Sequence, residues 1–203
     1  MNLVFGNLAT LKNYVLQTAQ VAGVDFDAVL ATIGRGVAAS IQRHCNRKFQ
    51  RVEDDTFTQF ADRPFAVLVR YPVEAVTKLE LRSPGGDWVE QTGVTMQVNE
   101  ETGIVTFGGA PGAREDMLRV TFTGGYFVET LEPDDEGYPT EQPDGSTAMP
   151  DDLRLAWLMQ CQQVFVTGDK MNVGALKGDK AVIEPATFTP AVLDILRGHI
   201  RYA

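Results

Sequence analysis

Side chains that could perform catalysis or bind a metal are few in this chain of 203 residues, and they lie far apart. The only histidines are His44 and His199, and the one potential ligand next to either is Cys45. Adjacent residues on a helix point about 100° apart, so His44 and Cys45 make a poor chelate. No G-x-S-x-G nucleophile motif occurs. We therefore expect no metal site, no cofactor and no catalytic group, and hence a protein that is not an enzyme.

Two further patterns are typical of loops. The glycine-bearing stretches 108–112 and 174–180 lack the Gly-Lys-Ser/Thr ending of a phosphate-binding loop. Residues 129–149 hold seven carboxylates and three prolines but no Lys or Arg, and the prolines interrupt the register of a calcium loop. We expect a long acidic loop that faces solvent or a partner. The candidate partner-facing residues are Glu132, Asp134, Asp135, Glu136, Glu141 and Asp144.

The charge and composition exclude several classes of protein. A formal net charge of −9 argues against a protein that grips DNA through clustered Lys and Arg, although an acidic wall suits a conduit through which DNA passes. Neither a secretory signal nor a membrane-spanning apolar run is visible, so we expect synthesis in a cytoplasm and no membrane partner. Cys45 and Cys161 have apolar neighbours in helical segments, which predicts reduced core cysteines.

Helical periodicity marks four segments. The first covers residues 8–22, and the second begins after Asp25 and ends in a basic cluster that includes Arg43 and Arg47. A third begins at Pro150 and ends at Gly168, and a fourth begins at Pro190. The fourth is short, and its apolar positions are Val192, Leu193, Leu196 and Ile200.

Between residues 52 and 127 the period changes to two, which is typical of β-strands. Over 76–82 we expect Thr77, Leu79 and Leu81 to share one face. Further strands are expected around Trp88, over 94–98, over 104–107, and over 118–123 with Leu118, Val120 and Phe122 on one side. These strands predict a small antiparallel sheet or barrel.

The expected fold class is α+β: long central helices, an inserted small antiparallel sheet or barrel, and a C-terminal tail helix. We expect one domain over 1–203. Its parts are N-terminal helices (1–49), a β elaboration (50–128), an acidic loop (129–149), a helix (150–168), and an extended loop with the last helix (169–203).

Four short motifs in this order resemble the head-tail connector, or adaptor, family of long-tailed bacteriophages. They are Asn46-Arg47-Lys48-Phe49 at the end of the second helix, Arg70-Tyr71-Pro72-Val73 followed by Val76, Val120 to Tyr126 with its Gly-Gly-Tyr ending, and Met149 to Ala156. The family pattern departs here at the long acidic segment, where a brief loop is usual, and at the long stretch 167–203.

The resemblance implies a structural subunit of a ring, typically twelve-fold, beneath the portal. Such a ring extends the DNA channel and offers a docking face for the tail, while DNA passes without specific binding. The implied partners are other copies of the chain, the portal protein and the next neck or tail component, and the implied place is the head-tail junction of a virion. Another neck or tail-completion protein is the main alternative, and a small cytoplasmic enzyme with scattered catalytic residues is a weaker one.

Within that interpretation three surfaces are candidates for assembly. We expect residues 186–203 to dock on the portal and to lie outside the subunit's own core, and the acidic loop to face the tail or the lumen. The candidate portal-binding residues are Phe188, Val192, Leu193, Leu196, Ile200 and Tyr202, and the candidate subunit-interface residues are Arg43, Arg47, Lys48 and Arg51.

Overall fold

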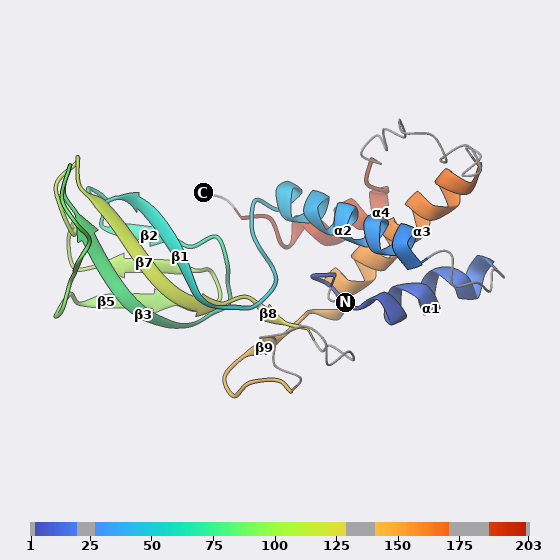
Figure 1. Ribbon diagram of the computed structural model, residues 1–203, viewed down its shortest axis with the longest axis horizontal. Coiled ribbons are helices and arrows are strands. Elements are labelled where there is room, and N and C mark those ends of the chain that lie inside the picture. The colour runs from blue at the N-terminus through green and yellow to red at the C-terminus, as the bar shows by residue number, and fades with distance from the viewer. Residues whose placement is uncertain (1–2, 20–26, 129–140, 171–186, 202–203) are drawn as a thin grey trace. The chain divides into compact units, whose positions relative to one another are not determined.

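The computed structural model describes residues 3–19, 27–128, 141–170 and 187–201 (Figure 1). It confirms the mixed α+β class. The chain divides into two compact units. A helical unit contains the residues up to Asn46 and those from Met149 onward, and a β unit contains Arg47–Phe127 and Pro143–Ala148. The chain therefore leaves the helical unit, builds the β unit and returns.

The described part of the helical unit contains α1 (Leu8–Ala19), α2 (Asp27–His44), α3 (Asp151–Lys170) and α4 (Pro190–Arg197). All four expected helices are confirmed. The expected end of the first, residues 20–22, lies outside the described residues, and two other ends differ from the prediction. α2 ends at His44 because Asn46 takes a left-handed conformation with φ of 51°, a common helix terminator. α3 continues past Gly168, since one glycine weakens a helix by only about 1 kcal/mol.

Trp157 of α3 is the centre of the helical core. Its side chain is fully buried, stacks on Phe5 with ring centroids 6.4 Å apart, and donates from Nε1 to the Gly34 carbonyl of α2 at 3.0 Å. A Cβ built on Gly34 would lie 2.9 Å from Leu3 Cδ1 and 3.2 Å from the Trp157 ring. Gly34 therefore allows α2 to approach α3 closely. Cys45 and Cys161 are buried, as expected, and burial raises the pKa of the Cys161 thiol.

The last helix belongs to this core, and the expectation that residues 186–203 lie outside it is wrong. Val192 and Leu196 are fully buried. Gln160, itself buried on α3, accepts from the Thr189 N–H at 3.2 Å, and Thr189 caps α4. This tertiary contact is what stabilises a helix of eight residues, which is too short to form alone in water.

The β unit contains two antiparallel sheets and one short parallel pair. Strands β1 (Val52–Phe60), β7 (Met117–Gly124), β3 (Val73–Arg82) and β4 (Val89–Glu90) form one sheet in that order. Strands β2 (Phe65–Val67), β6 (Ile104–Phe107) and β5 (Met96–Asn99) form the other, and β8 (Tyr126–Phe127) pairs with β9 (Thr147–Ala148) in parallel. The two antiparallel sheets face each other (Figure 1).

The core of the β unit lies between those sheets. Leu118, Val120 and Phe122 of β7 are fully buried on one face, as their alternation predicts, and they pack with Val105 and Phe107 of β6. On β3 the prediction is wrong at one position. A bulge between Val76 and Lys78 shifts the register, so Val76 packs on the core while Thr77 is exposed. Because the extra residue breaks the period of two, alternation counted back from Leu81 and Leu79 placed Thr77 on the core face in the position that Val76 occupies.

Two glycines on α2 give a stability test of the helical packing. Gly34→Ala is expected to lower the free energy of unfolding by about 1 kcal/mol or more, because its methyl group overlaps Leu3 and Trp157. Gly36→Ala should raise it by about 0.5–1 kcal/mol, because no atom lies within 4 Å of the added Cβ and alanine favours helix. Thermal melting of both variants measures the difference. Equal effects of the same sign would contradict this packing.

Candidate assembly surfaces

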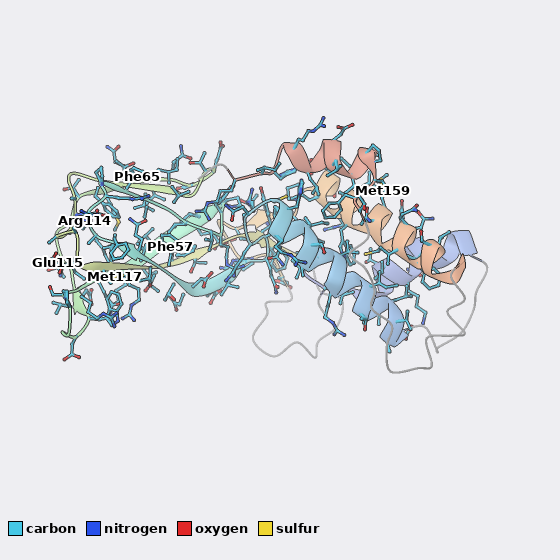
Figure 2. All side chains as sticks on the ribbon, turned by 90° about the horizontal axis from the view of Figure 1, so that it is seen from above. Phe57, Phe65, Arg114, Glu115, Met117 and Met159 are labelled. Carbon is cyan, nitrogen blue, oxygen red and sulfur yellow. The ribbon has the colours of Figure 1, made fainter. Side chains whose placement is uncertain are left out.

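The described residues offer little that resembles a chemical site. Among them no group of three His, Cys, Asp or Glu side chains is placed to hold a metal ion. None of the described helices is long and apolar enough to cross a membrane. One depression of about 370 Å³, open to solvent, is lined by Arg82, the turn Ser83–Gly86, Glu115 and Met117. Figure 2 shows Glu115 and Met117 at the end of the β unit where strand β7 begins. The candidate functional features are therefore surfaces.

Arg47, expected at a subunit interface, is buried within the β unit. Its guanidinium lies 3.5 Å from the centroid of the Tyr71 ring, 4.6 Å from that of Phe49 and 5.5 Å from that of Tyr126. It donates from Nη2 to the Tyr71 carbonyl, while Nε has no hydrogen-bond partner among the described residues. The ring faces stabilise the buried cation in place of a carboxylate. The interface prediction is therefore wrong for Arg47.

Arg51 is also internal. It donates from Nε and Nη2 to the two carboxylate oxygens of Glu74, both at 2.8 Å, and from Nη1 to Glu53 at 2.8 Å. These bonds, first of all the one with Glu74, raise the pKa of Arg51, and only 7% of its side chain is exposed. The acidic partners of Arg51, a candidate for the subunit interface, belong to its own chain. Arg43 and Lys48 are exposed and stay predictions for the interface.

Three of the four motifs that carried the resemblance meet at one place in the β unit. The chain enters beside Phe49 and leaves beside Tyr126, and the Tyr126 N–H donates to the Phe49 carbonyl at 2.7 Å. A Cβ on Gly124 would lie 2.7 Å from the Pro72 carbonyl oxygen, and one on Gly125 would lie 2.6 Å from that of Gln50. Gly125 also has a φ of 98°. The Gly-Gly-Tyr motif therefore serves close backbone packing.

A charged cluster covers the outer face of the β1-β7-β3-β4 sheet. Glu80 is 5% exposed, lies 2.9 Å from Lys78 Nζ, and accepts from Arg119 at 2.7 Å. The bond with Lys78, and after it that with Arg119, holds the pKa of Glu80 below its ordinary value against the opposing effect of burial. The guanidinium groups of Arg82 and Arg119 lie over the Trp88 ring at 4.7 and 4.3 Å. Sequence reasoning missed this cluster because its members belong to three separate segments.

The other candidate residues, those of the acidic loop and of the C-terminal segment, differ in whether the structure describes them and in how exposed they are. Glu141 and Asp144 are exposed, whereas Glu132, Asp134, Asp135, Glu136 and Tyr202 lie outside the described residues. On the C-terminal segment, Phe188, Leu193 and Ile200 are partly exposed. Phe188 packs edge-on against His44 at 5.4 Å, and His199 lies 2.9 Å from Asp152. Although burial works against ionisation, the His199 and Leu153 hydrogen bonds lower the pKa of Asp152.

Comparisons with known proteins give a structural likeness only. No family model matches the chain, and no curated protein matches it. A chain in the solved neck of an empty gene transfer agent (GTA) particle, computed with C6 symmetry, has a TM-score of 0.60 at 18% identity. That alignment covers 100% of this chain and 92% of that one. This chain has the fold of a GTA neck protein.

Two further solved structures match that GTA neck fold. One is the virion of the native GTA particle, with a TM-score of 0.59, 17% identity, and coverage of 97% of this chain and 89% of that chain. The other is the neck of the native GTA particle computed with C12 symmetry, with a TM-score of 0.56, 16% identity, and coverage of 97% and 88%. The likeness therefore includes both the helices and the β unit.

The role of α4 in its own core can be measured with two leucines on the same helix. Leu196→Ala is expected to lower the free energy of unfolding by about 2–4 kcal/mol, because it leaves a cavity where a fully buried side chain stood. Leu193→Ala, at a partly exposed position, should cost less than about 1 kcal/mol. Chemical denaturation of both variants is the measurement. A Leu196→Ala protein as stable as Leu193→Ala would contradict the packing of α4.

Glu80 predicts a pH dependence with a definite sign. Its pKa is lower in the folded state than in the unfolded chain, so its contribution is present above the ordinary glutamate pKa and is lost as the pH falls through the lower folded value. Glu80→Gln should therefore lower stability by about 1–3 kcal/mol at neutral pH. The difference from the unaltered protein should shrink below about pH 4.

Glu90→Gln is the matched control for Glu80→Gln. Glu90 is 56% exposed, and its carboxylate lies 4.0 Å from Lys78 Nζ. Its removal should change stability by less than about 1 kcal/mol at any pH, as is usual for exposed ion pairs. Urea unfolding at pH 7 and pH 3 compares the two variants. A Glu80→Gln deficit that stays constant between these pH values would contradict the assignment.

Proposed function

We propose that this protein is a structural subunit of the neck of a tailed phage-like particle and works as a homo-oligomeric ring. The observation that carries the proposal is the alignment of the whole chain with 92% of a chain in a GTA neck. A neck structure computed with C12 symmetry and another computed with C6 symmetry both match, which supports a ring.

In its finer form the proposal places the ring beneath the portal, as a head-tail adaptor that extends the DNA channel and receives the tail. The four ordered motifs support this form. The net charge of −9 also supports it, because a negative lumen repels DNA and lets it pass. Arg47 and Arg51, the buried cations of the entry segment, are bound within the subunit and cannot grip a phosphate backbone.

We propose that only part of the C-terminal segment docks on the portal, because some of its predicted contact residues are buried in the subunit. Val192 and Leu196 are occupied in the subunit's own core, which leaves Phe188, Leu193 and Ile200 as candidate contacts. Partly exposed apolar side chains on the last helix can bury their free area against a partner without unfolding the subunit. Tyr202 stays a candidate from the sequence alone. The exposed Glu141 and Asp144 are candidates for the surface that faces the tail or the lumen.

Electron microscopy of particles from the strain that carries the gene tests the proposal. The expected result is a ring of this chain in the neck, between a portal and a tail. In the genome, we expect a portal gene and a major capsid gene upstream of the gene for this chain. A double variant, Leu193→Ala with Ile200→Ala, should fold normally but attach to portal-bearing heads at least about tenfold less well. A matched pair of changes at exposed β-unit threonines, Thr58→Ala with Thr92→Ala, should have no effect.

Particles whose neck contains no copy of this chain would overturn the proposal. A ring found on the tail side of another neck protein would overturn the adaptor form and favour a tail-completion protein. Normal attachment of the Leu193→Ala, Ile200→Ala variant would remove only the assignment of the portal-docking surface.

A further inference from the structure

Helix α3 has apolar side chains on the side that its own unit does not cover. Its buried side carries Leu153, Trp157 and Cys161, which pack in the helical core. On the other side Leu155 is 44% exposed and Val166 is 37% exposed, with Met159 partly exposed between them (Figure 2). These three residues follow the helical repeat and form one stripe, which we call the α3 ridge. Isolated exposed apolar residues are ordinary, but a stripe along a helix indicates a contact surface.

Helix α2 has a complementary surface. Apart from Arg35, Arg43 and the terminal His44, its exposed residues are small, and a Cβ added to Gly36 would meet no atom within 4 Å. A mid-helix glycine on an open surface costs about 1 kcal/mol relative to alanine, and nothing within the subunit offsets that cost. We call this surface the α2 groove; its residues are Ala28, Thr32, Arg35, Gly36, Ala39 and Arg43.

The charges at the ends of the two surfaces have opposite signs. The exposed side of α3 begins with Asp151 and Asp152, whereas the exposed side of α2 carries Arg35 and Arg43. Within the described residues neither Asp151 nor Arg43 forms an ion pair, and Arg43 makes only a 3.5 Å contact with Ser40. Two α2 grooves placed together would bring arginines against each other. A ridge on a groove brings carboxylates to guanidinium groups.

The spacing of the residues agrees with antiparallel packing of the two helices. Asp151, Leu155, Met159 and Val166 follow one another along α3, and Arg43, Ala39, Gly36 and Ala28 follow in the reverse direction along α2. With Asp151 set against Arg43, Leu155 lies opposite Ala39, Val166 lies opposite Ala28, and Met159 lies opposite Arg35 and beside Gly36. The two ridge residues at the ends then face smaller alanines.

We propose that the α3 ridge of one copy packs into the α2 groove of the next copy, and that this contact closes the ring. The inference rests on the proposed function and names the surfaces that it needs. A contact between two different surfaces of the same subunit is heterologous, and such a contact repeats from copy to copy until the ring closes. The occupant is a second copy of this chain, because both complementary surfaces and both signs of charge belong to it.

Cysteine cross-linking of the full chain tests the contact. In the double variant Ala39→Cys, Leu155→Cys each copy carries one thiol on the groove and one on the ridge. Oxidation at high protein concentration should produce a ladder of trimers and larger species on a denaturing gel. Each single variant can link no more than two copies. The native Cys45 and Cys161 give a low background because both are fully buried. The control pair, Thr58→Cys with Thr92→Cys, uses exposed β-unit sites and should not form the ladder.

A charge exchange gives a second readout by sedimentation equilibrium. Arg43→Asp and Asp151→Arg should each weaken self-association about three- to tenfold, and the double exchange should restore it. Arg63→Asp, at an exposed β-unit position, should leave it unchanged. Dimers as the only cross-linked species, a ladder equal to that of the control pair, or a double exchange no better than either single variant would overturn the contact.

These outcomes separate the inference from the proposed function. A ring seen in necks together with a failed cross-link would remove the α2–α3 contact and leave the neck assignment in place. A ladder in solution together with necks that contain no copy of the chain would do the reverse.

Discussion

The rest of the structure depends on one contact, in which the segments where the chain enters and leaves the β unit are bound to each other. Arg47 marks the entry of the chain and Tyr126 its exit, and the rings of Phe49, Tyr71 and Tyr126 surround the Arg47 guanidinium. Because entry and exit are hydrogen-bonded to each other, about 80 residues of β-structure can be inserted between α2 and α3 without separating those helices. The helical core around Trp157 can then form from segments that are distant in sequence.

Burial of cations within the chain limits what this protein can do with DNA. Arg51 pairs with Glu74 inside the β unit, and Arg119 pairs with Glu80 on the sheet. Arg47 lies among aromatic rings and donates to the Tyr71 carbonyl. The carboxylates of segment 129–149 have no such internal cations in their own segment. The formal net charge of −9 agrees with the proposed conduit for DNA and not with a DNA clamp.

Exposed apolar side chains occur in both units. The β unit carries Phe60 and Val89, each 59% exposed, and helix α3 carries Leu155 and Val166. Leu155, Met159 and Val166 lie on α3, and Leu193 and Ile200 lie on the C-terminal segment. The buried residues of the same helices show that each helix has one face in the subunit and one available for assembly.

The sequence by itself determined the elements whose pattern is local. The four helices and the strand that carries Leu118, Val120 and Phe122 follow from periodicity, and the start of the last helix follows from Pro190. Tertiary structure alone decided the partners of the charged residues and the bulge at Thr77. It also decided that Val192 and Leu196 belong to the subunit's own core. The physical reason is that periodicity reports which face of an element is apolar, whereas what covers that face, and which carboxylate meets which guanidinium, depends on residues brought together from far along the chain.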